Sequence, residues 1–243
     1  MRAAFSDSAF DLATPAGRAA LEAVWGAPLV IATQVHGTAL TWFDSISAAR
    51  WADRPAQVDP AAGRPAGDVG AAGRPAAPSG AGQWPTCDAL ASAAGGIGLV
   101  VRVADCVPVL LADGAAGLVA AVHAGWRGLL AGVVPAALAN LRARGALRLR
   151  AALGPSICAD CYQVSPDLAK RAAEAGHAAT VAADGTARLD LAASVRAQLA
   201  RAGVEIAAGW AECTAESQRL FSWRQRRQAG RHGGIVMLRP PTP

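Results

Sequence analysis

The stretch VPVLLADGAAGLVAAVH, residues 107–123, decides the fold that we predict for this chain. It holds two apolar runs, Val107–Ala112 and Leu118–His123, on either side of a turn rich in Gly and Ala. Short apolar runs that flank such a turn are typical of two buried strands in a hairpin. Cys106 begins the first strand and His123 ends the second. Because hairpin strands are antiparallel, we expect Cys106 and His123 to be neighbours.

This pair becomes a candidate metal site when His36 is added, from the segment QVHG at residues 34–37. Two imidazoles and a thiolate suit zinc, and three protein ligands leave a fourth position for water or substrate. We therefore predict an open metal site at His36, Cys106 and His123. The Cys106–His123 contact is also compatible with a metal-free pair of thiolate and imidazolium. Asp105 is either a partner or proton carrier at this site or a polar residue at a strand end.

Arginines mark the candidate anion sites. Gly125 and Gly128 flank Trp126 and Arg127 at the start of a predicted helix, where backbone amides and Arg127 favour an anion; a tight strand-to-helix connection is the alternative. A C-terminal cluster that includes Arg224 and Arg231 is either a solvated positive face or an anion site. We assign phosphate or substrate binding to four residues: Gln34, Arg127, Arg224 and Arg231.

The composition limits the class of protein. A chain of 243 residues, 53% hydrophobic, can bury a sizeable core. The net charge of +5 comes almost entirely from Arg spread along the chain, which does not indicate nucleic acid, and Lys170 is the only lysine, which disfavours Schiff-base chemistry. Five cysteines cannot form a closed disulfide framework. We find no signal peptide and no apolar run long enough to span a membrane, so we expect a cytoplasmic protein.

The rest of the chain reads as a mixture of hairpins and helices, which predicts an α+β fold rather than a wound parallel sheet. Residues 53–82 are rich in Ala, Gly, Pro and Arg and contain an imperfect ten-residue repeat, AAGRPAGDVG followed by AAGRPAAPSG. We interpret this segment as a flexible surface insertion. Cys158 and Cys161 have half of a zinc-knuckle spacing, and Cys213 could approach them, but a structural or incidental role is favoured over metal binding. The predicted helices are 14–24, 129–144 with a bend or a split at Pro135, 165–175 and 190–202. The further predicted strands are 29–35, 38–43, 97–103, 148–153, 204–208 and 235–238.

Seven short motifs occur in a fixed order along this chain: QVHG, ADCVPVLL, HAGWRG, GPSI followed by an aromatic-x-V, a late CT, FSWR and GR. In this combination the chain resembles the laccase-domain family, also called the polyphenol oxidase family, which includes purine nucleoside phosphorylases. The resemblance runs from about His36 to Leu238 apart from the insertion, so we expect a single domain over residues 1–243. This chain has Trp223 where many relatives have Tyr, a difference that we expect to alter base stacking but not metal binding.

The resemblance implies a four-layer α-β-β-α sandwich with mixed sheets, and its metal ligands map onto His36, Cys106 and His123. It implies zinc-dependent phosphorolysis of adenosine, inosine, guanosine and methylthioadenosine, together with adenosine deamination. The alternatives are a copper-dependent polyphenol oxidoreductase and a metal-free Cys–His thiol hydrolase like a toxin deamidase of similar fold. We expect purine nucleosides and phosphate as the partners, no nucleic acid or membrane, and a monomer.

Overall fold

The hairpin predicted from residues 107–123 forms the centre of the larger sheet in the computed structural model, which describes residues 1–43, 84–227 and 230–239. Strands β6 (Val107–Asp113) and β7 (Leu118–Ala124) are antiparallel, with Val107 opposite Ala124. Asp113 stabilises the connection, since its Oδ1 accepts the N–H groups of Ala115 and Ala116 in the turn. The predicted hairpin is therefore confirmed.

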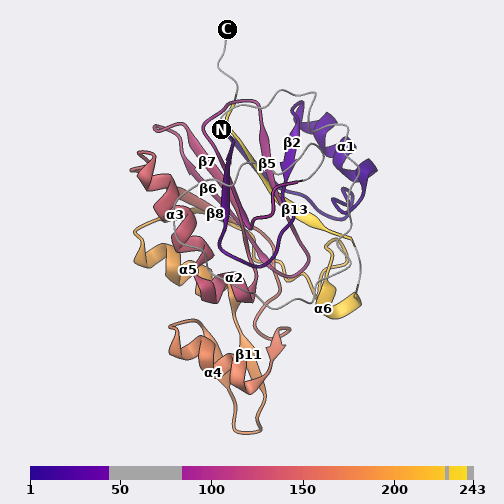
Figure 1. Cartoon of the computed structure of the whole chain (residues 1–243). Helices are drawn as coiled ribbons and strands as arrows, with labels where there is room; N and C mark the ends of the chain where they lie inside the picture. The colour runs from indigo at the N-terminus through magenta and orange to yellow at the C-terminus, as the bar shows by residue number, and fades with distance from the viewer. Residues whose placement is uncertain (44–83, 228–229, 240–243) are drawn as a thin grey trace.

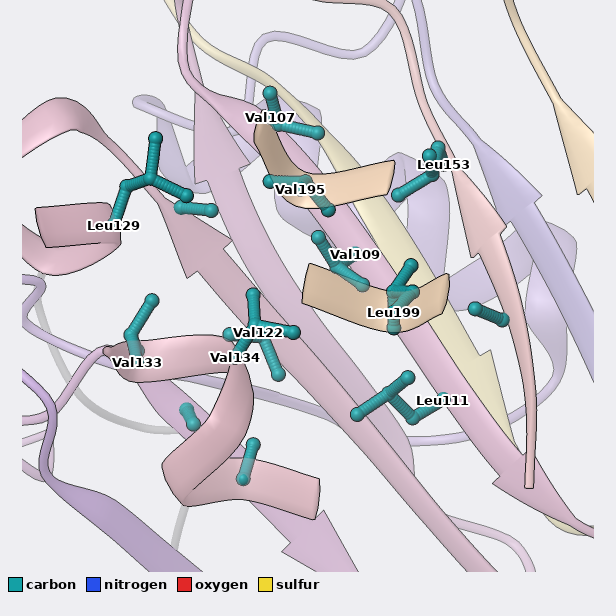
Figure 2. Packing of buried hydrophobic residues seen from close by; sticks show 14 of the residues in the cluster. Val107, Val109, Leu111, Val122, Leu129, Val133, Val134, Leu153, Val195 and Leu199 are labelled. Carbon is teal, nitrogen blue, oxygen red and sulfur yellow. The ribbon is translucent and has the colours of Figure 1, made fainter. Parts of the chain in front are cut away.

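This hairpin belongs to a six-stranded mixed sheet with the order β12-β8-β6-β7-β4-β3. The outer pairs β12–β8 and β3–β4 are parallel, and the inner pairs are antiparallel. Three helices cover one face, and their apolar side chains meet those of the central strands, as Figure 2 shows for Leu129, Val134 and Val195. The strands are β3 (Leu40–Phe43), β4 (Ala89–Ser92), β8 (Arg150–Leu153) and β12 (Glu205–Gly209), and the helices are α2 (Trp126–Ala131), α3 (Val133–Ala143) and α5 (Leu191–Arg201).

A second, four-stranded sheet packs on the other face of the first. Its order is β1-β13-β5-β2, formed by β1 (Arg2–Phe5), β13 (His232–Met237), β5 (Gly98–Val103) and β2 (Leu29–Ile31). Side chains such as Leu99 and Leu110 fill the space between the sheets. Helix α1 (Pro15–Trp25) covers the outer face of the second sheet through Leu21 and Trp25 (Figure 1). The predicted single-domain four-layer α-β-β-α sandwich of the α+β class is thus confirmed.

A small unit extends from one end of the sandwich (Figure 1). Helix α4 (Pro166–Glu174) lies beside a three-stranded antiparallel sheet of β9 (Gln163–Val164), β11 (Ala187–Leu189) and β10 (Ala179–Val181). The last helix is the single turn α6 (Trp223–Arg226), capped by the Ser222 side chain.

Two element predictions were wrong in detail. The helix predicted for residues 129–144 is two helices, and the break falls at Gly132, whose φ is 86°, rather than at Pro135. Pro135 lies in the first turn of α3, where its missing N–H removes no intrahelical bond. The strand predicted for residues 29–35 ends at Ile31.

The remaining predicted elements are present within a few residues of their predicted bounds. The prediction for residues 53–82 lies outside the described residues. Among the described residues, every helix is too short or too polar to cross a lipid bilayer.

Candidate metal and active site

The side chains of Cys106 and His123 meet at one end of the sandwich, where the chain passes from β5 into β6. Val119 and Ala121 of β7 contribute to the core between the two sheets. Since side chains alternate along a strand, His123 points to the same inter-sheet side. Cys106 directly precedes Val107, which pairs with Ala124 beside His123. The hairpin register therefore brings the thiol and the imidazole to neighbouring strand ends, as the sequence predicted.

His36 reaches this end from a loop that follows β2. Its backbone lies in the left-handed region, with φ of 61°. The carboxylate of Asp88 holds this conformation by accepting the N–H groups of His36 at 2.9 Å and of Gly37 at 2.6 Å. The His36 Nε2 atom lies 4.0 Å from Cys106 Sγ, and its ring centroid lies 4.8 Å from that of His123. The structure thus brings the three predicted residues together.

Asp88 is a central residue of this site that our sequence analysis missed. It is fully buried, and its Oδ1 lies 2.9 Å from His123 Nδ1. Burial raises the pKa of Asp88, but the hydrogen bond and charge of His123 and the two loop N–H groups lower it below its ordinary value. An ionised Asp88 orients His123 so that Nε2 is the ring nitrogen left for a metal, the arrangement usual around ligating histidines. The signal in the sequence was a lone acid directly before the apolar run of β4, since buried acids are almost always partnered.

Charges within the site favour an ionised thiol. Burial raises the pKa of Cys106, but the charges and hydrogen bonds of His123 and His36 outweigh it and lower the value to about 6. Burial lowers the pKa of His123, whereas Cys106 and Asp88 raise it to about 9. A thiolate is the form that binds metal or attacks an electrophile, so the electrostatics prepare Cys106 for either role.

The three side chains could hold a metal ion. Each residue offers one ligand atom, a ring nitrogen of His36 and of His123 and the sulfur of Cys106. These three atoms all lie within 4.8 Å of one another. Gly125 leaves the space between them free, because a Cβ at this position would lie 2.6 Å from His36 Cδ2 and 3.0 Å from Cys106 Sγ. The glycine of HAGWRG therefore has a steric role beside the ligands, in addition to starting α2.

Substitution of Gly125 by Ala is expected to separate His36 from Cys106 and to weaken metal binding. Overpacking of this kind costs about 1–3 kcal/mol of stability. Gly114→Ala is the matched control, because its Cβ would meet nothing within 4 Å. Zinc affinity from chelator competition and thermal unfolding should change for Gly125→Ala only. Wild-type zinc affinity in Gly125→Ala would contradict this arrangement.

Two of the predicted anion-binding arginines, Arg224 and Arg231, lie near this end of the molecule. Burial lowers the pKa of Arg231, and the nearby charges of Cys106, Asp11 and Asp105 oppose this shift. The Arg224 guanidinium lies 4.8 Å from the centroid of the Tyr162 ring. Burial and the nearby Cys106 raise the pKa of Tyr162 to about 12, while Arg224 and Arg127 oppose this rise. Tyr162 is half-buried and Arg127 is exposed, and a direct role of Arg127 toward an anion stays a prediction.

Asp105 and Gln34 hold the surroundings of the site. The carboxylate of Asp105 accepts hydrogen bonds from the Thr214 hydroxyl at 2.7 Å and from the backbone N–H of Arg224 at 2.6 Å. With φ of 93°, Asp105 lies in an irregular segment directly before β6, which is the backbone geometry that its predicted role as a partner or proton carrier requires. Both ends of the Gln34 amide bond the backbone of Arg102 at 2.9 Å, which fixes the loop that carries His36. A direct role of either residue toward substrate stays a prediction.

Comparison with known proteins gives a consistent family assignment. A family model described as multi-copper polyphenol oxidoreductase laccase matches residues 10–239. The purine nucleoside phosphorylase of Streptomyces coelicolor is 45% identical over 87% of this chain and 76% of that protein. An adenosine deaminase from an unknown prokaryotic organism is 40% identical, but the match spans only 49% of this chain and 48% of that protein.

A solved structure supports the fold independently. The Neisseria meningitidis protein NMB0706 aligns with a TM-score of 0.67 and 29% identity, over 92% of this chain and 80% of the other. The four-layer arrangement of this chain is therefore one found in a crystal structure.

Proposed function

The chain belongs to the family described as multi-copper polyphenol oxidoreductase laccase, and within that family we propose that it is a zinc-dependent purine nucleoside phosphorylase that also deaminates adenosine. The observation that carries this proposal is the convergence of His36, Cys106 and His123. Arg224, whose backbone N–H donates to Asp105 next to Cys106, adds a cation nearby. Relatives named purine nucleoside phosphorylase and adenosine deaminase support an enzyme of this kind.

His36, Cys106 and His123 would hold the zinc ion. When bound, zinc supplies a Lewis acid that polarises a substrate atom or lowers the pKa of a water molecule. The protein supplies the geometry: Asp88 fixes the tautomer of His123, and the His36 loop is anchored on the same carboxylate. Three protein ligands leave room for substrate beside the ion, which is the arrangement of catalytic rather than structural zinc.

In phosphorolysis, a phosphate oxygen attacks C1′ of the ribose, the bond from C1′ to the purine nitrogen breaks, and the base leaves with the bonding electrons. The products are ribose 1-phosphate and the free base. Arg127, Arg224 and Arg231 are suited to holding the phosphate and its developing contact with the ribose. In deamination, water replaces the amino group of adenosine, and ammonia leaves.

The proposal is tested by incubating the purified chain with adenosine, inosine and methylthioadenosine, with and without phosphate, and separating the products. We expect free base and a ribose 1-phosphate only when phosphate is present, and inosine from adenosine in either case. A chelator should abolish both activities and added zinc should restore them. Failure to convert any of these nucleosides by a zinc-loaded chain would refute the proposal.

Arg231→Ala is expected to weaken phosphate binding more than nucleoside binding, because removing one charge-assisted contact costs about 1.5–3 kcal/mol. The KM for phosphate should rise by at least about tenfold, with less change in adenosine deamination. Arg150→Ala is the control, because Arg150 forms an exposed ion pair with Glu205 at the far strand edge. Equal losses of phosphorolysis and deamination in Arg231→Ala would contradict the phosphate role.

Two other functions have a specific observation in their favour. The family description names copper and polyphenols; metal analysis after expression with both metals, and an oxidation assay on phenols, test that activity. The opposed pKa shifts of Cys106 and His123 suit a thiol hydrolase. Activity that resists a chelator but is blocked by iodoacetamide would favour that function.

A further inference from the structure

A second group of metal-ligand side chains lies on two loops beside the candidate active site. It consists of Cys158, Cys161, Cys213 and Glu216, whose ligand atoms all lie within 4.8 Å of one another. The first two cysteines follow β8, and the other two residues come from the segment between β12 and α6. The sequence showed the Cys158–Cys161 spacing and left open an approach by Cys213, but it did not identify Glu216, because both residues are more than 50 positions away.

The backbone brings these loops together in a defined register. Ser156 and Cys213 form a parallel bridge, and the Thr214 N–H donates to the Ser156 carbonyl at 3.1 Å. A tight turn follows Cys158, in which the Tyr162 N–H donates to the Ala159 carbonyl at 3.1 Å. The turn places the two sulfurs of the C-x-x-C segment on the same side as Cys213.

The donors already interact in ways that suit metal ligation. The Cys158 N–H donates to Cys213 Sγ at 3.3 Å, which brings candidate ligands from the two loops into direct contact. The Cys161 thiol lies 3.4 Å from Glu216 Oε1. Cys213 is buried, Cys158 and Cys161 are half-buried and Glu216 is exposed, so an ion can enter from the Glu216 side.

We propose that Cys158, Cys161, Cys213 and Glu216 bind a structural zinc ion. Three thiolates and one carboxylate supply the four ligands of tetrahedral zinc and close its coordination, in contrast to the three-ligand site at His36, Cys106 and His123. Three of these four donors are sulfur, which zinc binds well, whereas magnesium and calcium prefer oxygen ligands. The ligand set therefore favours zinc.

The position of this group gives the ion a structural task. Residues next to its cysteines contact Asp105, since the Ile157 N–H donates to the Asp105 carbonyl at 2.9 Å and the Thr214 hydroxyl donates to its carboxylate. Tyr162, next to Cys161, lies under the guanidinium of Arg224. A bound ion would therefore fix two loops that form one wall of the candidate active site. This positioning role rests on the proposed function, whereas the binding of zinc does not.

The test separates the two sites by working in the Cys106→Ala chain, where the active-site ligand set is broken. The full chain is purified, incubated with zinc and desalted, and zinc is counted per chain. We expect about two ions in the wild type, about one in Cys106→Ala and none in the double variant Cys106→Ala/Cys161→Ala. Undiminished zinc in the double variant, or none in Cys106→Ala, would overturn the proposal.

A cobalt spectrum decides the matter if the double variant does not fold. Cobalt(II) loaded into the folded Cys106→Ala chain should show strong sulfur-to-metal charge-transfer bands with tetrahedral d–d bands, because only the second group then supplies thiolates. Glu216→Gln should alter the d–d bands and weaken affinity while the thiolate bands persist. Absence of the thiolate bands would refute a zinc site. So would a disulfide among these cysteines in freshly purified, zinc-treated protein, detected as an intact mass lower by two hydrogens.

The same samples show whether failure lies here or in the proposed function. Suppose that Cys106→Ala binds one zinc ion while the zinc-loaded wild type converts no nucleoside. This result would support the structural site and reject the catalytic proposal. Removal of that zinc by a chelator should also lower the melting temperature of Cys106→Ala, since a metal that binds only the folded chain stabilises it. An unchanged melting temperature would contradict the structural task.

Discussion

Replacing Cys106 with Ala is expected to remove about one metal ion per chain and to reduce nucleoside turnover by more than about 100-fold. The sulfur is one of the three candidate ligand atoms, 4.0 Å from His36 Nε2 and within 4.8 Å of a ring nitrogen of His123. Loss of a residue that merely orients a ligand already costs about 10–100-fold, so loss of a ligand itself should cost more. Metal content per chain and kcat on the preferred nucleoside measure the two effects.

Cys87→Ala is the matched control for this substitution. Cys87 is also a buried thiol, but it packs in the core between the two sheets, and burial raises the pKa of its thiol to about 11. We expect Cys87→Ala to keep both the metal and turnover. Full turnover in Cys106→Ala would reject the metal role of Cys106. A Cys106→Ala chain that retains its metal but loses all turnover would instead identify Cys106 as a nucleophile.

The sequence predicted those parts of the site that depend on local structure. Cys106 and His123 belong to one hairpin, so the apolar runs and the turn between them determine their approach without knowledge of the remaining fold. The helix caps were predictable for the same reason, as Thr14 and Ser165 each precede a Pro and accept the expected backbone N–H.

Features that depend on contacts between distant segments could not be predicted. His36 adopts its left-handed backbone because of Asp88, 52 residues further along the chain. The pattern of apolar residues carries no record of such a contact, so the strand was extended to Val35. The break at Gly132 was missed for a different reason: a Pro is a strong helix breaker inside a helix but harmless in a first turn, and the sequence did not show where the turn began.

Asp88→Asn is expected to weaken zinc binding at the active site by about 10–100-fold, which is the usual effect of removing the carboxylate partner of a ligating histidine. The carboxylate of Asp88 accepts hydrogen bonds from His123 Nδ1 and from the N–H groups of His36 and Gly37. In Asn the NH₂ group would replace one of the two acceptor oxygens and would face one of these donors. His123 would lose its fixed tautomer, and the His36 loop would lose its anchor. Each buried N–H left unsatisfied also costs about 1–3 kcal/mol of stability.

Asp113→Asn separates the metal effect from the stability effect. Asp113 is a second fully buried carboxylate, and its oxygens accept N–H groups of Ala115, Ala116, Leu147 and Arg148 at the opposite end of the hairpin. These bonds, that of Arg148 first, lower its pKa to about 2. Asp113→Asn should therefore lower the free energy of unfolding about as much as Asp88→Asn, because both lose buried N–H acceptors.

Zinc affinity should distinguish the two variants, since only Asp88 contacts a candidate ligand. Competition with a zinc chelator at a temperature where both variants are folded measures the affinity, and thermal unfolding measures the stability. Wild-type affinity in Asp88→Asn would show that Asp88 supports the fold without orienting His123. An equal loss of affinity in Asp113→Asn would show that the metal site responds to general destabilisation of the hairpin, and the specific role of Asp88 would then be rejected.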